Sequence, residues 1–454
     1  MSNPNSGAQA GNVPSQGAPS RRAFLQDAGF VAAGAAVMGA LSLKAEPPTP
    51  EAEPKPQPQG YHVSVDHTLR VGLVGCGGRG TGAAVNAMHA DKNAKIIALA
   101  DAFPDRIANV RKQLEKEIPD QFAVDDDHCF AGMMCHEPMA QSEVDVVLLA
   151  TPPHFRPMQL AACVEAGKHI FCEKPVAVDG SGCKSVLESA AKAKEKGLNL
   201  VSGLCWRYDV GMRETMDRVL SGAIGDLVAV QTNYLAGTLW HRGQKPEWSE
   251  MEYQLRNWLY FTWLSGDHIV EQNIHSIDKA LWLNGDKLPT SCFGMGGRQQ
   301  RTEEMFGNIY DHHAVCYEWA DTGVKGFNYT RQMARTFNDT EDYVLGTKGR
   351  AQLIRHEING PEGTWKYDGP RPSMYDVEHE HLFGAIRRGD VINNGEYMTY
   401  STLMAIMGRE ACYTGEVIKP DDLLNSSASL KPEAYVMGPA PQYPIAIPAF
   451  AKVG

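Results

Sequence analysis

Leu69-Arg-Val-Gly-Leu-Val-Gly-Cys-Gly-Gly-Arg-Gly80 is the stretch that decides the fold of the first half of this chain. An apolar run ends in Gly75, Gly77 and Gly80, and a helix-forming segment follows directly. The first glycine permits a tight turn, the second lets a pyrophosphate approach the backbone, and the third lets helix and strand pack closely. The pattern predicts a strand, a turn and a helix whose N-terminus faces phosphate charge.

Asp101 indicates that the ligand of this turn is a dinucleotide. It ends the next predicted strand, 24 residues after Gly77, close to the spacing of about 20 for a ribose-binding acid. A carboxylate there accepts hydrogen bonds from ribose hydroxyls and repels a 2′-phosphate. We therefore expect NAD, and NADP stays possible because Arg106 lies nearby. Gly78 and Arg79 complete the predicted cofactor residues of the turn.

Strands and helices alternate through the first half of the chain. Continuous Val/Ile/Leu runs between helical segments are typical of a parallel sheet covered on both faces. We predict an α/β fold, with a doubly wound Rossmann domain over residues 67–205. The predicted strands are 69–75, 95–101, 144–151, 169–172 and 198–204, and the predicted helices are 81–89, 104–117, 157–166 and 182–196.

Residues 206–420 follow a different pattern, with longer alternating runs and fewer helices. This predicts a C-terminal α+β domain for substrate and oligomerisation, built on an open, mainly antiparallel sheet. The proline-rich end, residues 421–454, is predicted to wrap a surface as a tail. The expected strands are 227–238, 314–319, 324–330 and 343–354, and the expected helices are 212–221, 375–388 and 399–414.

The N-terminal segment predicts export. Arg21-Arg22 precedes a weakly apolar stretch, residues 30–43, as in a twin-arginine signal, here assigned to residues 1–45. A proline-rich linker over residues 46–66 follows. Because that route carries folded proteins, we expect a tightly bound cofactor, the twin-arginine machinery as a partner and a periplasmic or other extracytoplasmic location. The alternative is a disordered basic tail.

Composition excludes some classes of function. The 454 residues carry a net charge of −11, which argues against nucleic acid as a partner. The ten cysteines lack metal-type spacing. The run Asp311-His312-His313 precedes a strand and also lacks partner spacing, so we predict no metal site.

Residues 167–175, which end in Glu173-Lys174-Pro175, resemble the Glu-Lys-Pro signature of the Gfo/Idh/MocA family of glucose-fructose oxidoreductases and inositol dehydrogenases. Ala150-Thr-Pro-Pro153 resembles the family's Thr-Pro loop, and Trp206-Arg207-Tyr208 resembles its Arg-Phe segment. The likeness covers roughly residues 68–415. It implies that Thr151, Pro152, Glu173 and Lys174 border the cofactor.

The resemblance also implies a catalytic set. Glu271 and His275 are four residues apart, which predicts one helical face. A carboxylate beside an imidazole orients it and raises its basicity. The family assigns proton transfer to the histidine, and Glu271 stands where the usual acid is Asp. Lys174 is expected to hold negative charge on the reacting oxygen. Judged without the family, the Glu271/His275 pair is a surface ion pair.

Substrate-side residues are predicted with alternatives. His154 and Arg156 line the substrate, or they serve the start of a helix. Trp240, in a Trp-rich stretch, stacks on a sugar, or it packs in the protein or at a subunit interface. Arg207 and Asp278 complete this set.

The leading hypothesis is an NAD(P)-dependent enzyme that transfers hydride between a nicotinamide and a secondary alcohol of a sugar, inositol or related polyol. One alternative is an NAD-dependent glycoside hydrolase that uses transient oxidation. The other is a non-catalytic nucleotide- or sugar-sensing binding protein. We also expect a homo-oligomer.

Overall fold

Two sheets organise the residues that the structure describes. The structure is a computed structural model that describes residues 63–453. The predicted export signal with Arg21-Arg22, and the linker as far as residue 62, lie outside the described residues. Everything below belongs to one unit, Gln57–Gly454.

The first sheet is parallel throughout, with the strand order β3-β2-β1-β4-β5-β6. Apolar cores lie on both of its faces, which explains why its strands read as continuous apolar runs. This order defines a doubly wound domain and confirms the predicted Rossmann fold. Its elements are β1 (Leu69–Val74), α1 (Gly78–Ala90), β2 (Ala94–Asp101), α2 (Pro104–Glu117), β3 (Cys129–Ala131), α3 (His136–Gln141), β4 (Val146–Leu149), α4 (Arg156–Glu165), β5 (His169–Cys172), α5 (Gly180–Glu195) and β6 (Leu200–Ser202).

The second sheet has the order β14-β13-β12-β11-β7-β10-β9-β8. Only the β7–β10 pair is parallel, so the predicted open, mainly antiparallel sheet is confirmed. The expected single run 343–354 is two strands, because a turn closed by Gly346 and Gly349 folds it back. Its strands are β7 (Leu227–Ala236), β8 (Ser291–Gly297), β9 (His312–Trp319), β10 (Val324–Gln332), β11 (Asp342–Gly346), β12 (Arg350–Gln352), β13 (Glu357–Gly360) and β14 (Gly363–Lys366).

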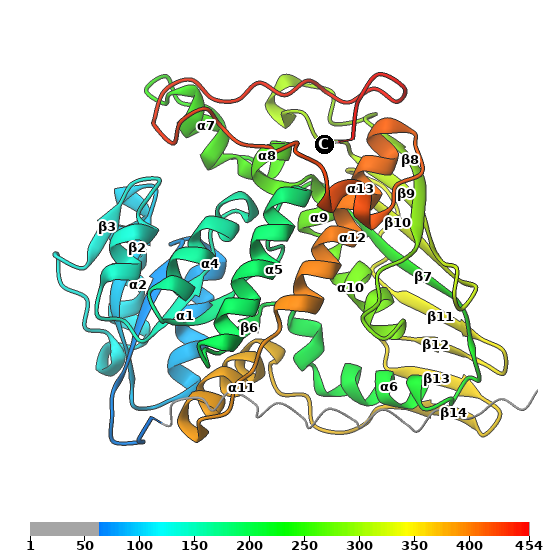
Figure 1. Cartoon of the computed structure of the whole chain (residues 1–454), viewed down its shortest axis with the longest axis horizontal. Helices are drawn as coiled ribbons and strands as arrows, with labels where there is room; N and C mark the ends of the chain where they lie inside the picture. The colour runs from blue at the N-terminus through cyan, green and yellow to red at the C-terminus, as the bar shows by residue number, and fades with distance from the viewer. Residues whose placement is uncertain (1–62, 454) are drawn as a thin grey trace, which may run out of the picture. The chain divides into compact units, whose positions relative to one another are not determined.

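Helix α12 (Gly395–Thr414) joins the two halves. It packs against α5 on one side and against α10 and β8 on the other, as Figure 1 shows. Most of its residues are buried, as expected of a helix with protein on every side. The other helices of this half are α6 (Val210–Leu220), α7 (Glu250–Arg256), α8 (Thr262–Ser265), α9 (His268–Glu271), α10 (Ile274–Leu283), α11 (Met374–Arg388) and α13 (Pro420–Leu424).

Late segments of the chain return to the Rossmann domain. Helix α11 packs on α1, and Asn393 pairs with Leu200 of β6. After α13 the described residues form no further helix or strand, and the tail passes over α7 and α8 (Figure 1). A hydrogen bond attaches the tail to α7: Met251 N donates to the Gly438 carbonyl at 2.9 Å.

Within residues 63–453, none of the helices has the length and apolar character needed to cross a membrane.

Candidate active site

The glycine turn has one packed side and one open side. Gly75 has φ +103°, and a Cβ on Gly80 would lie 1.9 Å from the Gly75 carbonyl oxygen. These two positions therefore require glycine for the turn and for the close helix contact. A Cβ on Gly77 or Gly78 would meet no atom within 4 Å. The backbone is thus open where helix α1 begins, which fits the approach of a pyrophosphate.

Asp101 is held in place by the turn itself. Its Oδ2 accepts a hydrogen bond from Cys76 N at 2.7 Å, and its Oδ1 accepts one from Phe103 N at 2.9 Å. Burial raises the pKa of this carboxyl, and the two backbone donors oppose the rise. Each carboxylate oxygen keeps a further lone pair, so Asp101 can still accept bonds from ribose hydroxyls.

A pocket of about 950 Å³, which includes space open to solvent, lies on the open side of the turn. The second half of the chain supplies one of its walls. Lys174 and His275 are not among its lining residues. Of the predicted residues, the lining includes Gly75, Gly77, Gly78, Arg79, Asp101, Thr151, Pro152 and Trp240, and it adds Arg106, Arg242 and Trp258 among others.

Arg79 makes protein contacts that sequence reasoning missed. Its guanidinium pairs with Glu173 and, at 2.5 Å, with Glu378 of α11. Burial raises the pKa of Glu378, and Arg79 opposes the rise. Glu378 is 299 residues from Arg79, so nothing in the local sequence could have connected them. The three side chains join the glycine turn, the Glu-Lys-Pro segment and α11.

Lys174 is paired with Glu271. Its Nζ donates to the Glu271 carbonyl at 2.8 Å and lies 3.3 Å from Glu271 Oε1. Gln272 Nε2 donates to the other carboxylate oxygen at 2.6 Å. The Lys174–Pro175 peptide is cis. The hydrogen bonds to Glu271 fix the ammonium group in position, and the Glu271 carboxylate balances its charge.

The expectation that Glu271 and His275 share one helix is wrong. Helix α9 ends at Glu271, and α10 begins at Ile274 with Asn273 as its N-cap. This break frees the Glu271 carbonyl from a helical hydrogen bond and gives it to Lys174. No hydrogen bond joins Glu271 to His275 in the described part of the chain. Its position in the sequence had suggested that Glu271 orients the imidazole. The structure shows no such contact between these two described residues.

His275 is held neutral. Its Nδ1 is buried and has no hydrogen-bond partner. Burial lowers its pKa well below the usual range, and the charge of Lys174 lowers it further. A neutral imidazole near an ammonium group can accept a proton from a ligand, with Nε2 as the available nitrogen.

Arg207 and Asp278 bind each other. Arg207 Nη2 lies 2.8 Å from Asp278 Oδ1 and 2.6 Å from Asp286 Oδ1. Ser401 Oγ also donates to Asp278 at 2.7 Å. The pair was predicted on the substrate side, and the structure gives both charges protein partners.

His154 and Arg156 also contact protein. His154 Nε2 lies 2.8 Å from the Tyr435 hydroxyl of the tail, and burial lowers its pKa to about 4. Arg156 is buried and donates from Nη1 to the Pro175 carbonyl at 2.6 Å. Arg156 is the first residue of α4, and this bond ties it to the Glu-Lys-Pro segment.

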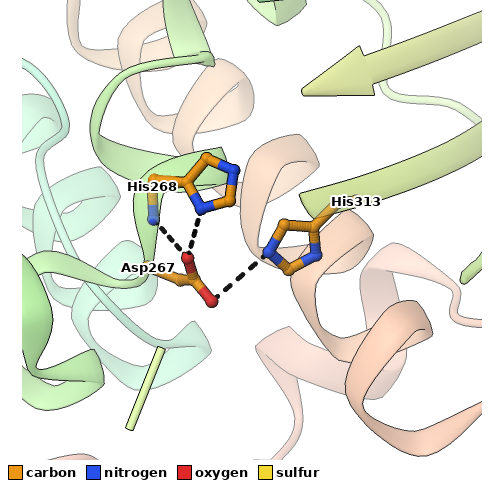
Figure 2. A group of neighbouring side chains, drawn as sticks. All are labelled: Asp267, His268 and His313. Atoms are coloured by element: carbon orange, nitrogen blue, oxygen red, sulfur yellow. Dashed lines mark hydrogen bonds and ion pairs between the residues drawn. The ribbon is translucent and has the colours of Figure 1, made fainter. Parts of the chain in front are cut away.

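A polar cluster joins the start of α9 to β9: Asp267 is the N-cap of α9, His268 is its first residue, and His313 comes from β9 (Figure 2). Asp267 Oδ1 is 2.8 Å from His268 Nδ1, and Oδ2 is 3.3 Å from His313 Nε2. Oδ2 also accepts bonds from Tyr310 N and the Tyr413 hydroxyl.

The donors around Asp267 define the role of this cluster. Arg301 Nη2 lies 3.3 Å from His268 Nδ1 and would repel a cation there. Although burial opposes it, His313 and His268 hold the pKa of Asp267 well below its usual range. The geometry is that of a hydrogen-bonded anchor for α9.

Comparison with known proteins agrees with this architecture. Residues 69–199 match the model of the GFO_IDH_MocA family, described as "Oxidoreductase family, NAD-binding Rossmann fold". A scyllo-inositol dehydrogenase from Lactobacillus casei, solved with NAD(H) and scyllo-inositol, superposes with a TM-score of 0.58 at 19% identity, over 78% of this chain and 99% of that one. The sequence of the Rossmann domain is thus similar to the Gfo/Idh/MocA oxidoreductases, and the likeness in fold extends through the second half.

Three relatives show the range of this likeness. The 2,7-anhydro-N-acetylneuraminate hydratase of Escherichia coli (strain K12) is 25% identical over 64% of this chain and 69% of its own length. The scyllo-inositol 2-dehydrogenase (NAD(+)) of Bacillus subtilis (strain 168) is 25% identical over 64% and 76%. A glycosyl hydrolase family 109 protein of Shewanella amazonensis is 26% identical over 87% and 83%. The fold and the dehydrogenase relative support a dehydrogenase-like enzyme.

Proposed function

We propose that this protein is an NAD-dependent oxidoreductase that acts on a secondary alcohol of a sugar, inositol or related polyol. The observation that carries the proposal is a fixed ammonium group, Lys174, together with a partly buried neutral imidazole, His275. Lys174 follows strand β5 of the Rossmann sheet, and His275 lies in helix α10 of the second half. The inositol dehydrogenase relative supports the choice of a polyol as substrate.

Three side chains have separate roles in the proposed reaction. His275 accepts the hydroxyl proton at Nε2, and Lys174 stabilises the negative charge that develops on the substrate oxygen. Glu271 keeps Lys174 in place through its carbonyl and carboxylate. NAD, when bound, supplies the hydride acceptor. Reduction runs through the same groups in reverse.

The cofactor is proposed to be NAD and to be tightly held. Gly77 and Gly78 leave room for a pyrophosphate, and Asp101 lines the same pocket, where it can accept bonds from ribose hydroxyls. The fixed carboxylate disfavours a 2′-phosphate, so NADP is the weaker ligand.

A substrate panel tests the activity. Purified protein with NAD is offered inositols, aldoses and sugar acids, and NADH formation is followed by absorbance. Lys174→Ala and His275→Ala should each lose turnover by about a hundredfold or more, in the range of a lost acid–base group. Lys196→Ala, which removes a peripheral lysine paired with Glu165, is the matched control. Normal activity in either site variant would refute the catalytic role assigned to that residue.

A second candidate is a glycoside hydrolase that oxidises its substrate transiently. It is favoured by the family 109 relative, whose likeness spans more of this chain than the two other relatives described above. Aryl glycosides distinguish the two activities, because the hydrolase releases the aryl alcohol without net NADH. Retained nucleotide without turnover on either panel would indicate a sensor instead.

A homo-oligomer is proposed from the outer face of the second sheet. Phe293 and Met295 of β8 are exposed, as are Phe327 and Tyr329 of β10. The register aligns Phe293 with Phe327 across Cys316 of β9, so these side chains share one face. Exposed apolar faces of this kind mark protein interfaces. Phe327→Glu combined with Met295→Glu should lower the mass measured by light scattering, and an unchanged mass would contradict the proposal.

Export is proposed from the sequence alone. Changing Arg21 and Arg22 to Lys should leave the protein in the cytoplasm, as measured by cell fractionation. Normal export of that variant would refute the proposed route.

A further inference from the structure

The wall of the nucleotide pocket that comes from the second half of the chain carries an unpaired positive charge. Arg242 lies between β7 and α7 and lines the pocket together with Gly77 and Gly78. It also lines a neighbouring hollow that Gly77, Gly78 and Arg106 border. An arginine that is distant in sequence is thus presented to the open side of the glycine turn.

Neither Arg242 nor Arg106 has an ion pair within residues 63–453. The nearby Arg256 shows the contrast, because it pairs with Asp105 at 2.9 Å and with Glu252 at 2.8 Å. Asp105 is therefore already engaged by another cation. Burial lowers the pKa of Arg242, and repulsion from Arg106 and Arg256 lowers it further. An anion between Arg242 and Arg106 would relieve this repulsion.

The backbone around Arg242 is fixed by buried side chains. Asn257 Oδ1 accepts a hydrogen bond from Arg242 N at 2.8 Å, and Asn257 Nδ2 donates to the Gly243 carbonyl at 3.1 Å. Tyr260 donates to the carbonyls of Leu239 and Trp240 at 3.1 and 3.0 Å. Asn257 and Tyr260 are almost fully buried. The Arg242 guanidinium also stacks on Trp240, 4.6 Å from the ring centre.

We propose that Arg242, with Arg106, forms a guanidinium clasp that binds the pyrophosphate of the dinucleotide from the side opposite the glycine turn. The inference rests on the proposed function, since it assigns residues to the same cofactor. A planar guanidinium suits phosphate oxygens, which it can bind in bidentate fashion. The pyrophosphate is the favoured anion because Arg242 lines the same pocket as Gly77 and Gly78, and Asp101 repels a 2′-phosphate.

Binding of ADP-ribose to nucleotide-free, full-length protein tests the clasp by titration calorimetry. Arg242→Gln should weaken ADP-ribose binding about tenfold, the usual effect of one charge-assisted hydrogen bond. Arg242→Lys should recover most of the affinity, because the charge remains. Adenosine, which lacks phosphate, should bind both variants as it binds the unaltered protein. Arg218→Gln, at an exposed pair with Glu214, is the charge-matched control.

Two further measurements separate the outcomes. Tyr260→Phe keeps Arg242 but removes both carbonyl contacts, so it should weaken ADP-ribose and leave adenosine unchanged. ADP-ribose 2′-phosphate identifies the phosphate involved: a loss in Arg242→Gln that is confined to this probe would overturn the pyrophosphate assignment.

Unchanged ADP-ribose affinity in Arg242→Gln, or an equal loss for adenosine, would also overturn the clasp. If the unaltered protein binds no ADP-ribose, the proposed cofactor itself fails. Normal ADP-ribose binding without dehydrogenase activity would leave the clasp standing and contradict only the proposed reaction.

Discussion

Glu271→Gln separates two roles for this residue. The structure pairs its carboxylate with Lys174 and Gln272 and gives it no bond to His275. The substitution keeps the side chain's shape and removes its charge. It also leaves the backbone carbonyl that receives the 2.8 Å bond from Lys174. We therefore expect a partial loss of positioning of Lys174 and no change at the imidazole.

The size of the loss follows from the geometry. At the 3.3 Å separation of Nζ and Oε1, the Coulomb attraction is about 5 kcal/mol for an effective dielectric constant of about 20. Desolvation of the two part-buried charges offsets much of this. A net charge-assisted bond contributes about 1.5–3 kcal/mol. Because the bond from Lys174 to the Glu271 carbonyl remains, we expect a loss of transition-state stabilisation near the lower end of this range, about 1.5 kcal/mol. Such a loss lowers kcat/KM about tenfold.

The assay is kcat/KM measured across pH for the unaltered enzyme and for Glu271→Gln, with a substrate found in the panel. The acid limb of the profile, which reports His275, should stay in place while the plateau falls. Arg218→Gln again serves as a control away from the site. An acid limb displaced by about one pH unit, the effect of a lost interaction of about 1.4 kcal/mol with the imidazole, would refute the reasoning.

Four other predictions follow from the same geometry. Gly80→Ala should abolish nucleotide retention, measured as nucleotide released per chain, because its Cβ would lie 1.9 Å from the Gly75 carbonyl. Glu378→Gln should lower the melting temperature, because breaking a buried ion pair costs about 3–5 kcal/mol; an unchanged value would refute this. The acid limb of kcat/KM should lie below about pH 6.5, the ordinary value for histidine, since burial lowers the pKa of His275. Burial also lowers the pKa of His154, His169 and His268 to about 4 in the folded protein. As the pH falls, these histidines therefore bind protons in the unfolded chain at a higher pH than in the folded chain. Stability present above about pH 6.5 is lost as the pH falls, by about 2 kcal/mol per histidine at about pH 5, which urea unfolding at two pH values would measure.

Features encoded by neighbouring residues could be predicted from sequence. Gly75, Gly77 and Gly80 stand next to the strand and the helix that they join, so their roles follow from local sterics. The strand over 169–172 and the helix over 104–117 have the predicted bounds. The pattern of apolar residues indicates both elements, and Pro104 marks the first turn of the helix.

Other features depend on distant partners or on competition for hydrogen bonds. Arg79 reads as a residue of the glycine turn, and its pairing with Glu378 arises only because α11 returns to pack on α1. The spacing of Glu271 and His275 satisfies a helix, yet the Lys174 ammonium takes the carbonyl that a continuous helix would use. Trp240 was predicted either to stack on a sugar or to pack in the protein or at a subunit interface, and in the structure it lines the pocket beside the glycine turn.

The most direct test of the central claim is NADH formation by the purified protein on the polyol panel, run in parallel for Lys174→Ala and His275→Ala. At least one polyol or sugar should produce NADH, and both variants should lose this activity while they still bind ADP-ribose. NADH formation that persists in either variant, or a protein that binds no nicotinamide nucleotide at all, would contradict it.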